Sequence, residues 1–105
     1  MPRGELDIAK NIKMIEGLQC ELLSLVSQLF CSMQDGKETA RERVELLANM
    51  EVMIYLLANR LGISCQLLDQ KVVSRLKLGI LEEEDGEEWK DSLRGILRHI
   101  DKTRE

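Results

Sequence analysis

The stretch that decides the fold, residues 48–63, reads ANMEVMIYLLANRLGI. Its centre, Val52 to Ala58, is the longest uninterrupted apolar run in the chain. That run is far shorter than the roughly 20 residues a helix needs to span a bilayer. Gly62 suits the left-handed backbone that ends many helices, and Ile63 is the apolar residue that packs back onto such an end. The pattern predicts a helix that stops just before Gly62, with Ser64 as the N-cap of the next helix.

The helix that contains this stretch is predicted to span residues 39–61. Its apolar residues recur at three- and four-residue intervals: Val44, Leu47, Met50, Ile54, Leu57 and Leu61. Its second half is apolar on almost every side, so it has to be covered on every side. Because a four-helix monomer of this size seldom covers its central helix completely, we expect a homodimer or a higher homo-oligomer.

The same periodicity predicts three more helices, over residues 8–33, 65–78 and 88–103. An acidic run from Glu82 to Glu88, interrupted by glycine, reads as a solvated linker before the last helix. The only proline is Pro2, so no helix breaker follows it. We therefore expect an all-α fold: one four-helix domain over residues 1–105, completed by dimerisation.

Composition narrows the classes of function. The 105-residue chain has a net charge of −4, which argues against a general nucleic-acid binder. Its three cysteines are widely spaced, without a Cys-x-x-Cys pair, which predicts reduced thiols rather than a disulfide framework or a zinc site. The N-terminal residues show no signal-peptide pattern. We expect a cytoplasmic protein that binds neither nucleic acid nor membrane.

Two segments resemble the signature helices of the MazG-like family, within the all-α nucleoside triphosphate pyrophosphohydrolases. Residues 48–63 resemble the second signature, where a Glu-x-x-Asp motif leads into an apolar segment and then Arg-Leu-Gly-Ile, and the similarity is close after Glu51. Residues 23–29, LSLVSQL, resemble the first signature, Glu-Glu-x-x-Glu. The resemblance implies a helical bundle in which converging carboxylates bind Mg²⁺ and a water cleaves a nucleoside triphosphate, releasing pyrophosphate.

Carried over by position, most of the family's acids are missing. The first motif falls on Ser24, Leu25 and Gln28, none of which is ionised, and the second falls on Ala48 and Glu51. Leucine cannot ligate Mg²⁺, and neutral oxygens bind it more weakly than carboxylates do. The sequence therefore argues against efficient catalysis by the family mechanism while it supports the family fold.

The nearest acid that could compensate is Glu21, one turn before Ser24. A reduced site would use Glu51 and Glu21 for the metal, with Ser24 and Gln28 orienting water or ligand. Glu51 shares a helix face with apolar residues, so it either has a ligand or is a structural ion pair or a partly exposed side chain. Glu21 could equally be a solvated acid at the edge of the core.

Two cations on the third predicted helix, Lys71 and Arg75, are i, i+4 neighbours on one face. The resemblance implies that basic residues on this helix hold phosphate; the alternative is an ordinary basic surface. The only histidine, His99, has no cysteine or second histidine near it in the sequence, and no residue is assigned as catalytic.

Three functions stay open on these observations. The first is a diverged MazG-like protein that binds a nucleotide or phosphate, with weak or absent hydrolysis. The second is a non-catalytic helical module that associates with itself or with another protein. The third is an active Mg²⁺-dependent pyrophosphohydrolase with substituted ligands.

Overall fold

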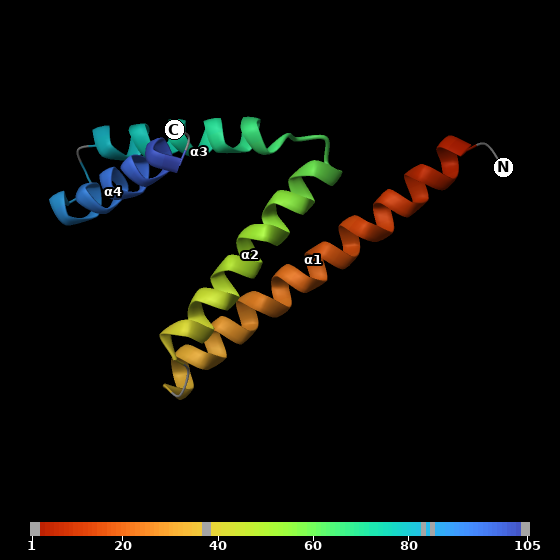
Figure 1. Cartoon of the computed structure of the whole chain (residues 1–105), viewed down its shortest axis with the longest axis horizontal. Coiled ribbons are helices and arrows are strands. Elements are labelled where there is room, and N and C mark those ends of the chain that lie inside the picture. The colour runs from red at the N-terminus through yellow and green to blue at the C-terminus, as the bar shows by residue number, and fades with distance from the viewer. Residues whose placement is uncertain (1–2, 37–38, 83, 85, 104–105) are drawn as a thin grey trace. The chain divides into compact units, whose positions relative to one another are not determined.

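The structure is a computed structural model that describes residues 3–36, 39–82, 84 and 86–103. Four helices follow one another along the chain: α1 (Arg3–Asp35), α2 (Ala40–Arg60), α3 (Cys65–Leu81) and α4 (Glu87–Thr103) (Figure 1). The described residues contain no strand, which confirms the predicted all-α class. The chain divides into two compact units, Met1–Ser64 and Cys65–Glu105, which are described separately below.

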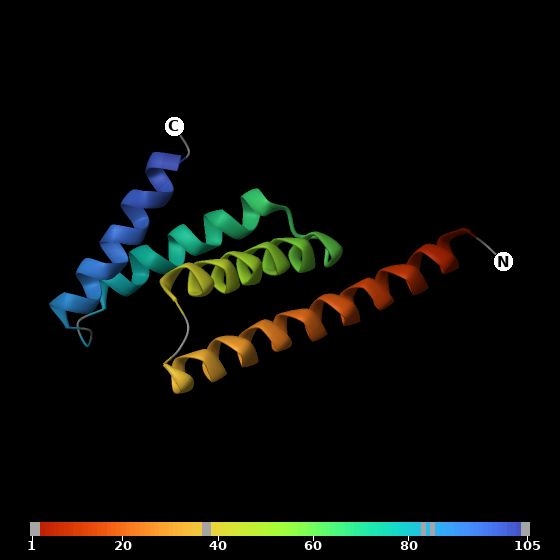
Figure 2. The same ribbon diagram turned by 60° about the horizontal axis from the view of Figure 1, so that its bottom comes forward.

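The first unit is a helical hairpin in which α1 and α2 run antiparallel (Figure 2). Its core is an inner seam of buried and half-buried apolar residues. On α1 these are Ile15, Leu18, Leu22, Leu25 and Leu29, and on α2 they are Leu46, Met50, Met53 and Leu57. They recur every three or four residues, as expected for helices packed along one stripe. At the open end of the hairpin, the Asn11 side chain donates a hydrogen bond to the Arg60 carbonyl at 3.1 Å.

Local signals fix both ends of α2. At its start, the Glu42 backbone N–H donates to Thr39 Oγ1 at 3.2 Å and the Thr39 N–H donates to Glu42 Oε2 at 3.1 Å. This capping box satisfies two backbone donors that would otherwise lack partners. At its end, Gly62 has φ +84° and the Ile63 N–H donates to the Ala58 carbonyl at 2.8 Å. The predicted stop before Gly62 is confirmed, while the capping role of Ser64 stays a prediction.

The second unit pairs α3 with α4. Leu76 and Gly79 are buried on α3, and Leu93, Leu97 and Ile100 on α4 are half-buried. The predicted end of the third helix at residue 78 is wrong, because α3 continues through Gly79 to Leu81. A Cβ at Gly79 would lie 2.8 Å from Leu93 Cδ1. This glycine allows α4 to approach α3 closely instead of ending the helix.

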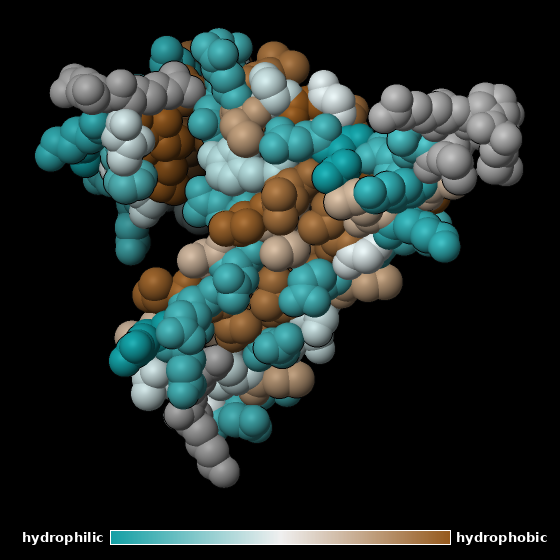
Figure 3. Space-filling model, turned by 45° about the vertical axis from the view of Figure 1, so that its right-hand side comes forward, coloured by the Kyte–Doolittle hydropathy of each residue, from teal (hydrophilic) through white to brown (hydrophobic). Residues whose placement is uncertain are grey.

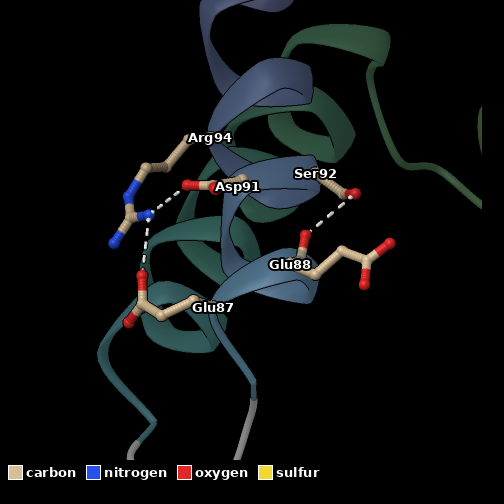
Figure 4. A network of polar contacts seen from close by, with 5 residues as sticks. All are labelled: Glu87, Glu88, Asp91, Ser92 and Arg94. Carbon is tan, nitrogen blue, oxygen red and sulfur yellow. Dashed lines mark hydrogen bonds and ion pairs between the residues drawn. The ribbon is translucent and has the colours of Figure 1, made fainter.

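Polar contacts support the first two turns of α4. Arg94 Nη1 lies 2.7 Å from Asp91 Oδ1 and 3.6 Å from Glu87 Oε2, and the Ser92 hydroxyl donates to the Glu88 carbonyl at 3.2 Å (Figure 4). Acidic residues in a first turn also interact favourably with the helix dipole. Of the predicted linker 82–88, residues 83 and 85 lie outside the described residues.

The other predicted boundaries agree closely with the structure, apart from α1, which extends beyond residues 8–33 at both ends. Among the described residues no single helix combines the length and apolar composition of a membrane span, although α2 and α3 pass that test when taken together as a broken pair.

Candidate functional site

The positions to which the sequence resemblance assigns the family's first motif lie on α1, in the hairpin. Ser24 and Gln28 are exposed, and Gln28 Nε2 donates a hydrogen bond to Ser24 Oγ at 3.1 Å. The two side chains therefore form a neutral pair with each other, one turn apart. Their remaining oxygen lone pairs face solvent and could accept from a water or a ligand.

Leu25, the third of these positions, belongs to the core. Its residue surface is only 5% exposed, the lowest value among the buried apolar residues. It is part of the inner seam that joins α1 to α2. A metal ligand at this position is excluded both by the chemistry of leucine and by its burial between the helices.

Glu51 and Glu21 are both exposed, and neither makes an ion pair or hydrogen bond with any residue that the structure describes. The sequence left three alternatives for Glu51: a ligand, an ion pair or an exposed side chain. In the single chain its side chain is exposed. Ala48, one turn before Glu51, contributes no polar side-chain atom. The two acids thus have free carboxylates, but whether they can meet depends on which side of the hairpin each occupies.

Two grooves identify the sides of the hairpin. One, of about 490 Å³, is lined by α1 residues together with Arg60 of α2: Asp7, Ile8, Lys10, Asn11 and Met14. The other, of about 720 Å³, is lined by Glu16, Gln19, Cys20, Leu22, Leu23 and Leu57. We call the first the Arg60 side of the hairpin and the second the Leu23 side.

Helical periodicity assigns the two acids to different sides. Glu21 follows Met14 by two turns and therefore shares the Arg60 side with it, as does Gln28 after two more turns. Glu51 precedes Arg60 by two and a half turns, so it projects from α2 in the opposite direction. Within one hairpin, Glu21 and Glu51 therefore diverge.

The described residues do not fit the family's metal centre. Nowhere in the described part of the chain do three or more His, Cys, Asp or Glu side chains gather closely enough to hold a metal ion. Helix spacing alone could not have revealed that Glu21 and Glu51 diverge, because it does not fix how the two helices are rotated about their axes. Binding of Mg²⁺ by either acid stays a prediction.

Lys71 and Arg75 lie on α3, in the second unit. They flank a shallow hollow of about 290 Å³, whose other lining residues are Leu68, Val72 and Leu76. Arg75 Nη1 lies 3.6 Å from Glu82 Oε1, and both side chains are more than half exposed, so this ion pair is weak. Lys71 has no ion pair with the described residues. The hollow therefore has an apolar floor bordered by two cations, of which only Arg75 makes a weak ion pair.

A further surface feature extends beyond the sequence prediction. Several large apolar side chains of the hairpin remain 43–70% exposed, and seven of them form a stripe beside the inner seam that we call the open face: Leu23, Phe30 and Met33 of α1, with Val44, Leu47, Ile54 and Leu61 of α2. Figure 3 shows apolar side chains gathered over the surface of the hairpin. The apolar periodicity of the sequence includes the α2 residues and Phe30 of α1, but not Leu23 and Met33. The signal that could have identified these two is a second set of apolar positions beside the inner seam.

The described helices define an all-α protein, and its relation to the nucleoside triphosphate pyrophosphohydrolases rests on a family match. The family model described as MazG-like family matches residues 8–93, and the chain belongs to that family. No curated protein and no solved structure matches the chain.

Proposed function

We propose that this MazG-like protein binds a nucleoside triphosphate, or another ligand that carries phosphate groups, and hydrolyses it weakly or not at all. The observation that carries the proposal is Leu25, which stands at a position of a family carboxylate and is only 5% exposed in the hairpin core. Family catalysis needs several converging acids to hold hard Mg²⁺ ions. Here an apolar contact between helices replaces one of them.

The remaining polar residues support binding better than catalysis. The neutral pair of Ser24 and Gln28 can orient water or a ligand but cannot offset the charge of a metal. Glu51 and Glu21 each offer a single carboxylate, so we propose at most weak binding of Mg²⁺ that accompanies the nucleotide. We propose that the protein acts in the cytosol, where the exposed thiols of its three cysteines would stay reduced.

Phosphate binding is assigned to Lys71 and Arg75. Two cations one turn apart can contact the same phosphate group, with Arg75 in a planar, two-pronged geometry. Both side chains border the apolar hollow on α3, which can accept an uncharged part of the ligand. Occupation by phosphate would displace only the weak, exposed pairing of Arg75 with Glu82.

Thermal unfolding tests the binding step. A ligand that binds only the folded chain stabilises it by about 2.7 kcal/mol at a hundred times its Kd. We expect the melting temperature to rise by several degrees with a nucleoside triphosphate and Mg²⁺. The double variant Lys71→Ala, Arg75→Ala should lose the rise.

Lys77→Ala is the matched control, because Lys77 is an exposed cation on the same helix but outside the hollow. It should keep the full response. If no triphosphate raises the melting temperature, or if Lys77→Ala abolishes the rise as well as the double variant does, the proposed site is wrong.

The second candidate, a non-catalytic interaction module, is favoured by a different observation, the open face. Exposed apolar patches larger than those of typical monomers mark interaction sites, and seven large apolar side chains of the open face are 43–70% exposed. Such a module would show no thermal response to nucleotide, and its melting temperature would instead depend on protein concentration.

A further inference from the structure

The groove on the Arg60 side differs in charge from the two other hollows described above. Its lining includes one cation from each helix of the hairpin, Lys10 of α1 and Arg60 of α2. The groove on the Leu23 side is lined by no cation, and both cations of the α3 hollow come from one helix. Asp7 is the only acid among the lining residues, so the groove has a formal charge of +1, from two cations and one acid, in a chain of net charge −4.

The two cations of this groove are not neutralised within the chain. Neither Lys10 nor Arg60 makes an ion pair with any side chain that the structure describes, and Asp7 makes none either. Two like charges that border one groove repel each other, and an anion held between them offsets this repulsion. The groove therefore favours a negatively charged ligand.

The carbonyl groups at the end of α2 already have hydrogen-bond partners. Unpaired carbonyls at the end of a helix carry partial negative charge and repel anions. Here the carbonyls of residues 57–59 accept hydrogen bonds from the backbone N–H groups of residues 61–63, at 2.8–3.1 Å. The Arg60 carbonyl, the last of the four, accepts from the Asn11 side chain at 3.1 Å. Because all four have donors, they oppose an anion in the groove less than an open helix end would.

The hydrogen bond from Asn11 also fixes the two sides of the groove. It joins the early part of α1 to the last residue of α2, and so holds Lys10 and Arg60 at the same groove. Asn11 is half-buried and lines the groove itself. Its amide has a second N–H, which can donate to a ligand. The groove thus combines two cations with one neutral donor.

We propose that this groove binds a phosphate monoester that carries hydroxyl groups, which is the chemistry of a sugar phosphate. A phosphate monoester has a charge of about −2 at neutral pH, which matches two cations, and three oxygens that accept hydrogen bonds. Arg60 can contact two of these oxygens with its planar guanidinium, while Lys10 supplies a point charge. Asp7 can accept a hydrogen bond from a hydroxyl group of the same ligand. Its charge would repel further phosphates, so the groove favours a monophosphate over a triphosphate.

The size of the groove suits such a ligand. Its volume of about 490 Å³ lies within the roughly 300–1,000 Å³ that is typical of small-molecule sites. The apolar side chains of Ile8 and Met14 line it as well and can contact the carbon atoms of the ligand. This groove shares no residue with the α3 hollow, so the inference goes beyond the proposed function and either can fail without the other.

The test is an NMR titration of the full chain at constant ionic strength, because salt screens exposed charges. The probes are glucose 6-phosphate, inorganic phosphate and glucose. The titrated protein carries Lys71→Ala and Arg75→Ala, so that the α3 hollow does not contribute. We expect saturable shifts of the backbone amide signals of the groove residues with glucose 6-phosphate, with a Kd of roughly 1 mM or lower. Inorganic phosphate should bind more weakly, and glucose should not bind.

Removing either cation should weaken the binding. Arg60→Gln and Lys10→Gln should each raise the Kd for glucose 6-phosphate by roughly fivefold or more, because each removes a charge that faces the phosphate group. Lys13→Gln is the matched control, since Lys13 is an exposed cation three residues after Lys10 but does not line the groove. It should leave the Kd within about twofold of its original value. Circular dichroism of every variant checks that the helices are retained.

Asp7→Asn tests the class of ligand. It removes a charge that repels inorganic phosphate, so that anion should bind about twofold tighter or more. The preference for glucose 6-phosphate should decrease, because a neutral amide oxygen accepts a weaker hydrogen bond than a carboxylate does.

Two results would overturn the site itself: no saturable binding of glucose 6-phosphate up to about 20 mM, or a Kd that Lys13→Gln raises as much as Lys10→Gln does. Equal affinities of the original protein for glucose 6-phosphate and inorganic phosphate would overturn the assigned class of ligand.

Discussion

The inner seam and the open face lie on the same two helices and have the same apolar spacing, yet only one of them is covered within the chain. Leu25 in the inner seam is 5% exposed, whereas Leu23, two residues away, is 70% exposed. Two residues correspond to a rotation of about 200° around a helix. Periodicity therefore identifies which residues can pack, but it does not say whether the partner belongs to the same chain.

The largest expected effect is the difference in unfolding free energy between alanine variants of Leu25 and Leu23. Leu25→Ala should lower the free energy of unfolding by about 3 kcal/mol, because it leaves a cavity between α1 and α2. Leu23→Ala should lower it by less than about 1 kcal/mol at protein concentrations where the chain is monomeric. Urea denaturation at low protein concentration measures both; equal losses would remove the distinction between the inner seam and the open face.

A smaller effect of opposite sign is expected at Glu51. Glu51→Leu places an apolar side chain between Leu47 and Ile54 of the open face, and we expect it to tighten the predicted homodimer by about 2 kcal/mol, or roughly 30-fold in Kd. Glu45→Leu adds the same side chain to the other side of α2 and should not tighten it. Sedimentation equilibrium of the two variants sharpens the assignment of the open face, and a tighter dimer with Glu45→Leu would contradict it.

The smallest effect concerns Gly62, the glycine that follows the end of α2. Gly62→Ala places a Cβ on a residue at φ +84° and should lower the stability by about 1 to 2 kcal/mol. Gly17→Ala is the control, since nothing lies within 4 Å of a Cβ added there and alanine favours helix by about 1 kcal/mol. Thermal unfolding should shift in opposite directions for the two variants. Shifts of the same sign would show that the backbone at Gly62 is not strained by a side chain.

Local chemistry explains which parts of the fold were predictable. The end of α2 was predicted because Gly62 and Ile63 satisfy a motif confined to a few neighbouring residues. The end of α3 was not, because the role of Gly79 depends on Leu93 of the following helix. A glycine can end a helix, or it can lie within a helix where a second helix packs closely against it. The residues next to a glycine in the sequence do not distinguish these two roles.

The candidate site was predictable residue by residue but not as an assembly. The prediction that family carboxylates are replaced at positions 24, 25, 28 and 48 needed only the sequence and its resemblance to the family signatures. The sequence could not show that Glu21 and Glu51 lie on different sides of the hairpin, because this depends on how each helix is rotated about its axis. The residues that line the two grooves define that rotation. On α1, Leu23 and Met33 were missed as members of an apolar stripe because they fall between residues of the stronger inner seam.

The most direct test of the central claim, that this chain keeps the MazG-like fold without efficient family chemistry, is release of pyrophosphate. The unsubstituted chain and Glu51→Gln should be compared on a panel of normal and damaged nucleoside triphosphates with Mg²⁺ or Mn²⁺. We predict little or no release, with no difference between the two proteins. Rapid release that Glu51→Gln abolishes would contradict the account and would show that a reduced set of carboxylates still supports the reaction.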